Sequence, residues 1–249
     1  MKRILITGGP TNEPIDEVMK ITNMSTGSLS TGLARLFLKA GYKVTLVLNQ
    51  GVKMEDDVNL KLVKVETTDE MLSALKEESD KQDLEGKYDC LIHAAAVGDY
   101  KADFSFLLED MAEEIYEQFD NIKSAQDILA IMENPKCKVN DDTKISSYQK
   151  NLTVKLGLTP KIISNLRAWF KDSLLIGCKL LENVSKDELF AVATRLANKN
   201  YMDYILANDL ADLRKGLPAR YLIDKDGFTN ITLPETRDIF NFVHEKVNQ

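Results

Sequence analysis

The chain has 249 residues, of which 44% are hydrophobic and 29% charged, with a formal net charge of −7, three cysteines and two histidines. This length fits one large α/β domain or two small ones, with a core that needs no disulfides. The sparse cysteines and histidines argue against a disulfide framework and against a metal centre rich in either residue. The acidic balance argues weakly against nucleic acid as a partner, and the apolar runs are too short to span a membrane. A strand that begins within the first three residues leaves no room for a signal peptide, so we expect a cytoplasmic protein.

Segments of strand type alternate with segments of helix type along most of the chain, which is the pattern of βαβ units. The predicted strands lie at 3–7, 44–48, 60–65, 90–96, 151–156, 174–178 and 204–207. The predicted helices lie at 27–40, 68–81, 125–133, 160–170, 186–199 and 236–247. Asp226-Gly227 separates strand-like runs at 221–223 and 228–231, which predicts a β-hairpin. We therefore expect a single domain over 1–249 with a Rossmann-like parallel sheet, helices on both faces and a small antiparallel hairpin.

Residues 101–143 interrupt this alternation of strand and helix segments. Their large apolar residues recur at helical spacing with acidic residues between them, namely Phe104, Leu107, Leu108, Met111, Ile115 and Phe119. We expect a helical insertion over about 101–143 whose apolar stripe packs near a ligand site. Ser124 should cap its second helix, and 134–143 should be a polar loop.

Small and hydroxyl residues flank the first predicted strand and helix. Gly8-Gly9 follows the strand and Ser25-Thr26-Gly27 precedes the helix, and both patterns can present backbone N–H or hydroxyl donors to a phosphate. A structural turn explains Gly8-Gly9 equally well, and Ser25 or Thr26 can instead serve as a helix N-cap. The GxGxxG fingerprint is absent, and Asn49 ends the second strand where a ribose-binding acid would stand.

Later strands also run into small or polar residues. The segment from His93 to Tyr100 leaves space beside the backbone at a carboxyl strand end, where open sheets bind ligands. Asp99 could hold a ligand hydroxyl or a metal-bound water there, or it could be a solvated loop carboxylate. His93 lies inside the apolar run and is interpreted as a core residue. Gly177 and the pair Asn208-Asp209 continue the pattern.

The order of these segments resembles the phosphopantothenate–cysteine ligases, which catalyse the second step from pantothenate to coenzyme A. The matching segments are ILITGGPTNEPID, ITNMSTGSLSTGLA, KVTLV, HAAAVGDY, KIS, IGCKLLE and LANDL. The run ITNMSTG after TGGPTNEP is the most specific part. The resemblance implies the free-standing form of the enzyme, without a flavoprotein decarboxylase domain before Met1, and a homodimer. The segment 151–156 is our candidate for strand pairing between subunits.

The resemblance also implies roles for single residues. It implies that Asn23 contacts an acyl-nucleotide intermediate, and together with Lys144 it is the candidate catalytic residue. The implied nucleotide-binding residues are Gly8, Gly9, Ser25, Thr26, Gly27, Ala95, Asp99, Lys144, Gly177, Cys178 and Lys199.

Four features depart from the family pattern. The KISS segment that begins at Lys144 is poor in lysine, Cys178 replaces a common phenylalanine, and Lys199 is one residue out of the family's spacing to Asp203. A long segment also separates Asp99 from Lys144 where a short flap is expected. By itself, Lys144 cannot be told from a solvated surface lysine.

The implied reaction joins 4′-phosphopantothenate to L-cysteine. The carboxylate attacks the α-phosphate of a nucleoside triphosphate and releases pyrophosphate, and the cysteine amine then attacks the acyl-nucleotide. Bacterial members usually use CTP with Mg²⁺, so we expect CTP rather than ATP, with metal ligands unassigned.

Two alternative functions remain open. An NAD(P)-dependent oxidoreductase would need a ribose-binding acid and a Tyr-xxx-Lys pair on a helix, whereas Tyr221 and Lys225 fall in a predicted strand and turn. A non-catalytic nucleotide-binding protein would bind nucleotide without releasing pyrophosphate.

Overall fold

A computed structural model describes residues 1–139, 144–217, 220–227 and 231–249. These residues divide into two compact units. The first unit comprises 1–11, 23–97 and 160–249, and the second comprises 12–22 and 98–159. The sequence predicted one domain with a helical insertion, and the second unit contains that predicted insertion together with strands that the prediction missed.

The first unit is built on an eight-stranded sheet in the order β13-β12-β11-β10-β6-β1-β4-β5. The strands from β5 across to β11 are parallel, and β12 and β13 add antiparallel at one edge. Their bounds are Arg3–Gly8 (β1), Lys43–Asn49 (β4), Leu60–Val65 (β5), Cys90–His93 (β6), Leu174–Leu181 (β10), Tyr204–Asp209 (β11), Arg220–Asp224 (β12) and Ile231–Thr232 (β13). The predicted parallel sheet and hairpin are confirmed, although 228–230 of the hairpin lie outside the described residues.

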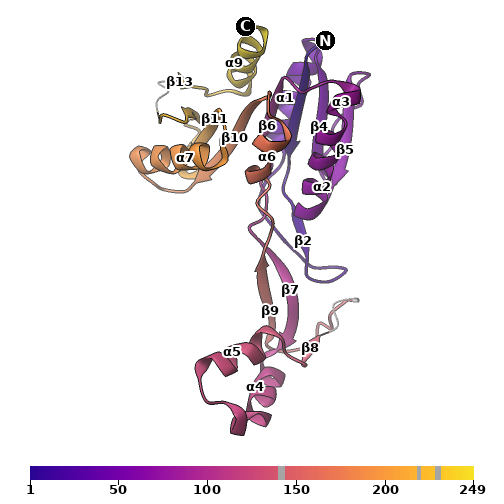
Figure 1. Cartoon of the computed structure of the whole chain (residues 1–249), viewed down its shortest axis with the longest axis vertical. Coiled ribbons are helices and arrows are strands. Elements are labelled where there is room, and N and C mark those ends of the chain that lie inside the picture. The colour runs from indigo at the N-terminus through magenta and orange to yellow at the C-terminus, as the bar shows by residue number, and fades with distance from the viewer. Residues whose placement is uncertain (140–143, 218–219, 228–230) are drawn as a thin grey trace. The chain divides into compact units, whose positions relative to one another are not determined.

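Helices cover both faces of this sheet (Figure 1). Because side chains alternate along a strand, Leu5 of β1 packs with α2, α6 and α7, whereas Ile4 and Ile6 pack with α1 and α9. The helices are Ser28–Lys39 (α1), Thr68–Asp80 (α2), Gln82–Glu85 (α3), Ile163–Trp169 (α6), Lys186–Asn200 (α7), Leu210–Arg214 (α8) and Thr236–Asn248 (α9). None of the helices in the described parts of the chain is long and apolar enough to cross a membrane.

The strand order creates a switch point between β1 and β6. From β1 the chain continues outward through β4 and β5, and it then returns to the other side of β1 with β6, β10 and β11. In open parallel sheets the connections that leave two such neighbouring strands diverge, and ligands bind in the crevice outside their carboxyl ends. The carboxyl ends of β1 and β6 therefore mark the candidate ligand site.

The second unit contains two small antiparallel sheets and a helical end (Figure 1). One sheet pairs β2 with β3, and the other has the order β8-β7-β9. The strands are Asn12–Pro14 (β2), Lys20–Thr22 (β3), Tyr100–Leu107 (β7), Lys138–Val139 (β8) and Leu152–Leu158 (β9), and the helices are Leu108–Glu117 (α4), Phe119–Asn121 (η1) and Ala125–Glu133 (α5).

The start of the predicted helical insertion was wrong. Residues 100–107 form a strand, in which Phe104 and Phe106 are both buried and Ser105 pairs with Val154 of β9. Phe104, Leu107 and the following apolar residues fit a helical period, but pairing with β9 gives this stretch a partner that a helix would lose. The two helices that follow are confirmed, and Ser124 does cap α5 through a capping box with Asp127.

The predictions for residues 134–143 and 151–156 had different outcomes. The expected polar loop at 134–143 contains strand β8, and 140–143 lie outside the described residues. The segment 151–156, our candidate for pairing between subunits, falls largely on β9, whose one edge pairs with β7 of the same chain. Pairing between subunits stays a prediction.

Candidate functional site

The loop after β1 is tightly packed at the switch point. A side chain at Gly8 would place its Cβ 1.8 Å from the Ser30 Oγ, so only hydrogen fits where β1 meets α1. Gly9 has a φ of +77°, and a Cβ there would lie 2.8 Å from the Cβ of Asn49. Both glycines therefore allow the main chain to pass close to neighbouring elements, as phosphate-binding turns require.

Gly27 begins α1 directly against this loop. Its φ is +71°, and a Cβ there would lie 2.9 Å from Val52 Cγ1 and 3.4 Å from the Gly9 Cα. The predicted N-cap at Ser25 or Thr26 was wrong, because Gly27 itself occupies the cap position. The hydroxyls of Ser25 and Thr26 instead accept long hydrogen bonds from the amides two residues further on, Gly27 N at 3.4 Å and Ser28 N at 3.3 Å.

The start of α1 has the electrostatics of an anion site. The first N–H groups of a helix lack acceptors within the helix, and the aligned peptide dipoles place partial positive charge there. No acidic residue lies in the first turn of α1 to offset that charge. The hydroxyls of Ser30 and Thr31 donate to the Gly27 carbonyl at 2.8 and 3.1 Å and fix the turn.

The segment after β6 completes the crevice. Ala96 N donates to the Gly9 carbonyl at 2.9 Å, and Ala95 N donates to the Thr7 hydroxyl at 3.2 Å. The exposed Asn23 reaches the same place, since its side-chain amide donates to the carbonyls of Ala96 at 3.3 Å and Val97 at 3.0 Å. The structure thus brings together the predicted residues Gly8, Gly9, Asn23, Gly27 and Ala95.

His93 lies at the end of β6 and is buried, as the core interpretation predicts. Its Nδ1 lies 2.8 Å from the Thr7 Oγ1. Burial lowers the pKa of His93 to about 4, so the ring is neutral at physiological pH. Through the Thr7 hydroxyl, which also accepts from Ala95 N, the histidine is linked to the backbone of the crevice.

Gly177 and Cys178 lie one strand further along the sheet. They were expected at a strand end, but β10 continues to Leu181, and Gly177 pairs with His93 on one side and Ile205 on the other. A Cβ on Gly177 would lie 2.8 Å from the Ile205 Cδ1, so this glycine is needed for packing. Cys178 faces the side of the sheet covered by α1 and α9.

Lys199 does not join this group. It is an exposed residue in the last turn of α7, and that helix leads into the amino end of β11. Because β11 is parallel to the rest of the central strands, Lys199 lies at the edge of the sheet opposite the carboxyl ends of β1 and β6.

The second unit holds the remaining two predicted site residues. Asp99 is exposed just before β7, and its carbonyl accepts from Thr159 N at 3.1 Å. Lys144 is exposed, and the amide of the buried Ile145 beside it donates to the Asp16 carboxylate at 2.9 Å. Hydrogen bonds from the amides of Met19, Ile145 and Val18 hold the pKa of Asp16 below its usual range.

Sequence reasoning missed Asp16 as the hydrogen-bond partner of Ile145, the residue next to Lys144. The signal was present in the turn-forming run Pro14-Ile15-Asp16, since aspartate often accepts hydrogen bonds from amides two or three residues ahead. What the sequence could not give is the partner from the distant segment at Ile145.

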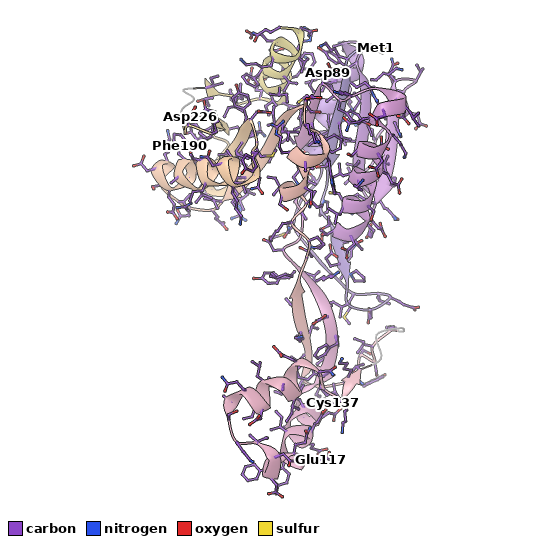
Figure 2. The ribbon with its side chains drawn as sticks, viewed as in Figure 1. Met1, Asp89, Glu117, Cys137, Phe190 and Asp226 are labelled. Carbon is purple, nitrogen blue, oxygen red and sulfur yellow. The ribbon has the colours of Figure 1, made fainter. Side chains whose placement is uncertain are left out.

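The three thiols are poor candidates for a nucleophile. Burial raises the pKa of Cys178 to about 12 and raises that of Cys90 well above its usual value. Cys137, which is labelled in Figure 2, has its pKa raised by burial and by the neighbouring Glu114 carboxylate. A thiol acts as a nucleophile in its thiolate form, so none of the three is activated.

Metal-binding side chains do not cluster in the described part of the chain. No group of three or more histidine, cysteine, aspartate or glutamate residues there is placed to hold a metal ion. The described side chains therefore do not fit a metal site built by the protein alone.

Comparisons with known proteins agree on one family. Residues 1–130 match the model of the DNA/pantothenate metabolism flavoprotein C-terminal domain. The coenzyme A biosynthesis bifunctional protein CoaBC of Methanocaldococcus jannaschii is 30% identical over 209 residues, which are 84% of this chain and 41% of that protein. The CoaBC of Borreliella burgdorferi is 28% identical over 240 residues, 96% of this chain and 50% of that protein. The chain thus spans half or less of the length of these relatives.

Solved structures share the fold. The DNA/pantothenate metabolism flavoprotein from Streptococcus pneumoniae aligns over 100% of this chain and 99% of its own, with 31% identity and a TM-score of 0.78. A Cab2 variant in complex with phosphopantothenate-cysteine aligns over 100% of this chain and 89% of its own, with 16% identity and a TM-score of 0.58.

Proposed function

Because the chain belongs to the family of DNA/pantothenate metabolism flavoprotein C-terminal domains, we propose that it is a phosphopantothenate–cysteine ligase of coenzyme A biosynthesis. The names of the CoaBC relatives support this assignment. The observation that carries it is the convergence of the Gly8-Gly9 loop, Asn23 and the start of α1 at the switch point. These are the segments by which the sequence resembles the ligases.

The reaction has to activate a carboxylate. An amine does not displace oxide from a carboxylate near neutral pH, so the carboxylate of 4′-phosphopantothenate first attacks the α-phosphate of a nucleoside triphosphate. Pyrophosphate leaves, and an acyl-nucleotide forms. The amine of L-cysteine then attacks the acyl carbon, the nucleoside monophosphate departs with the former carboxylate oxygen, and the amine loses a proton to give the amide.

The main barrier that the protein must lower is the meeting of two anions. We assign the N–H groups at the start of α1 and the Gly8-Gly9 loop to the phosphates, because they provide donors and partial positive charge without an acidic neighbour in the first helical turn. Holding the two reactants in line can remove roughly 7–11 kcal/mol of barrier. Such a mechanism needs no protein nucleophile, which agrees with the raised pKa values of the thiols.

Asn23 is the proposed residue closest to the chemistry. Its amide is held by the Ala96 and Val97 carbonyls, so its orientation is set by the main chain of the crevice. An amide group has both donor and acceptor capacity, which suits a site that meets an anionic acyl-phosphate and then an amine. We assign it to contact the acyl-nucleotide.

Lys144 is the proposed source of positive charge, and Asp99, Ser25, Thr26, Ala95, Gly177 and Cys178 remain proposed nucleotide contacts. The position of Lys199 at the opposite edge of the sheet argues against its inclusion. We propose CTP as the nucleotide, accompanied by Mg²⁺, which would neutralise phosphate charge. Because the described side chains form no metal cluster, no step is assigned to a metal held by the protein.

A dehydrogenase function is less well supported. Tyr221 lies in β12 and Lys225 in the turn that follows, so the pair does not have the helical setting that a short-chain reductase needs. Asn49, at the end of β4, accepts from Gly51 N at 2.9 Å and contacts Glu66 at 3.4 Å.

A pyrophosphate-release assay tests the proposal. The protein is incubated with CTP or ATP and 4′-phosphopantothenate, before and after addition of L-cysteine. We expect pyrophosphate with CTP in preference to ATP, and an amide product only once cysteine is present. Nucleotide binding without pyrophosphate release would favour the non-catalytic alternative, and quenching or enhancement of NADPH fluorescence would favour the dehydrogenase. Equal turnover with both nucleotides would remove the CTP assignment alone.

A further inference from the structure

The carboxylate of Asp16 joins two segments of the second unit that are far apart in sequence. One oxygen accepts from Val18 N at 2.7 Å and Met19 N at 2.6 Å, which closes a local turn. The other accepts from Ile145 N at 2.9 Å, across 129 positions of sequence. Asp16 is only 6% exposed and Ile145 only 5%, so this junction is shielded from water.

Main-chain hydrogen bonds also close the turn around Asp16. The Met19 carbonyl accepts from both Ile15 N at 2.9 Å and Asp16 N at 3.4 Å. A local aspartate turn would be complete with the bonds to Val18 and Met19 alone. The bond to Ile145 is therefore an additional constraint, and it acts on the residue next to Lys144.

Charge favours the same arrangement. An ionised carboxylate that accepts several amide hydrogen bonds binds more strongly than a neutral acceptor, and the nearby Lys144 charge further favours the ionised form. Lys144 itself is an exposed side chain, and a long flexible lysine loses side-chain entropy when it binds an anion. A mobile main chain would add a loss of backbone entropy to this cost, and anchoring the main chain at Ile145 reduces that second loss.

We propose that Asp16 is a positioning residue for the ligase reaction, whose hydrogen bond to Ile145 N anchors the main chain beside Lys144, the lysine assigned above to the nucleotide. This inference rests on the proposed function for the role of Lys144, but the anchoring of Ile145 by Asp16 does not depend on it. The chemical class of the ligand is a nucleoside triphosphate.

Two variants separate the anchor from the local turn. Asp16→Ser keeps a hydroxyl that can accept from the Val18 and Met19 amides but is too short to reach Ile145 as well. Asp16→Asn keeps the length but offers an N–H₂ group where an acceptor is needed. Asp103→Asn is the matched control, because it also removes a carboxylate charge from the same unit, but Asp103 pairs with Lys155 at 2.8 Å and not with the Ile145 amide.

Hydrogen exchange gives a readout that is independent of activity. The Ile145 amide should exchange about ten- to hundred-fold faster in Asp16→Ser and Asp16→Asn than in the wild type, as expected for loss of a hydrogen bond to a charged group. In Asp103→Asn it should exchange as in the wild type. Unchanged protection of Ile145 in both Asp16 variants would overturn the inference.

A double-mutant cycle tests the role in nucleotide binding. We expect both Asp16 variants to raise the nucleotide KM about ten-fold or more, with kcat and the cysteine KM changed far less. Combining Asp16→Ser with Lys144→Ala should give no larger KM than Lys144→Ala alone, since residues acting through one contact are not additive. Multiplicative effects would contradict the inference.

Failure of the ligase proposal and failure of the Asp16 inference would give different results. If the wild type releases no pyrophosphate, the ligase proposal fails, and the same cycle is then measured as CTP affinity by calorimetry. Coupled losses of affinity would still support Asp16 as the anchor of Lys144, whereas independent losses, or no CTP binding by the wild type, would overturn that role.

Discussion

The amide of Asn23 donates to two carbonyl oxygens at the switch point, those of Ala96 and Val97. An aspartate would replace this donor with a negative charge facing both carbonyls and, in the proposed reaction, an anionic acyl-phosphate. At an effective dielectric of about 20, two unit charges about 4 Å apart repel by about 4 kcal/mol. We expect Asn23→Asp to lower ligation at least about a hundred-fold with the fold retained.

The Asn23 prediction is checked by product formation and circular dichroism, with Asn165→Asp on the surface of α6 as the control. Pyrophosphate release with accumulation of acyl-nucleotide would place Asn23 in the attack by cysteine, and loss of pyrophosphate release would place it in activation. Near-normal ligation by a folded variant would mean that Asn23 is only a turn residue.

We expect His93 to make the stability of the first unit depend on pH. Burial lowers its pKa to about 4 in the folded protein from an ordinary 6.5, so between these values the unfolded chain binds more protons than the folded one. The contribution of His93 to stability is complete above about pH 6.5 and is lost as the pH falls toward 4. A shift of this size corresponds to about 3 kcal/mol in total, at about 1.4 kcal/mol per pH unit.

Urea unfolding of the wild type and of His93→Gln between pH 4 and 7 isolates this contribution. Carboxylates with lowered pKa values, such as Asp209, also destabilise the fold on acidification, but they do so equally in both proteins. The wild type should therefore lose stability more steeply than the variant over this range. Parallel curves would show that His93 is protonated in the folded protein as readily as in the unfolded chain.

At the scale of elements, the contact between α1 and the loop after β1 can be tested with two glycines. Gly27 and Gly41 both have positive φ, +71° and +81°, but a Cβ would meet Val52 at Gly27 and nothing within 4 Å at Gly41. Gly41→Ala should cost about 1–2 kcal/mol for the left-handed backbone alone.

Gly27→Ala should cost at least about 1 kcal/mol more, because overpacking adds to the same backbone strain. The free energy of unfolding in urea measures both changes. Equal losses for the two variants would contradict the close approach of α1 to Gly9 on which the proposed phosphate site depends.

Elements with a strong periodic pattern were predictable from the sequence. Helix α5 was predicted at its observed bounds, Ala125–Glu133, and β5 at Leu60–Val65. The strand β7 was not, because Phe104 and the apolar residues after it fit a helical period, and only its pairing with β9 decides the structure. That pairing joins residues about 50 positions apart, which a local pattern does not encode. The predicted packing of the insertion near a ligand site stays a prediction.

The candidate site also has a part that the sequence predicts and a part that it does not. Gly8, Gly9, Asn23, Gly27 and Ala95 were predicted and are brought together, because strand ends in a parallel sheet meet at one edge. The bond between Asp16 and Ile145 could not be predicted, since its two partners lie on different segments. Lys199 was predicted with them but lies at the opposite edge of the sheet, because α7 leads into the amino end of β11.

At the scale of the whole molecule, we predict a homodimer. In the three-stranded sheet of the second unit, β9 pairs with β7 on one side and is the last strand of the described order. An unpaired strand edge is a ready template for pairing with another chain. Light scattering at micromolar concentration should give twice the 28.1 kDa of one chain. A mass of one chain over that concentration range would contradict the prediction.

The path of a carboxylate oxygen tests the central claim, ligation through an acyl-nucleotide, most directly. 4′-Phosphopantothenate labelled with ¹⁸O in its carboxylate is incubated with the protein, CTP and L-cysteine. The masses of the products are then measured by mass spectrometry. Attack on the α-phosphate transfers one labelled oxygen to each CMP released and leaves the other in the amide, which is the result we predict. Unlabelled CMP, or CDP together with labelled inorganic phosphate, would contradict the account.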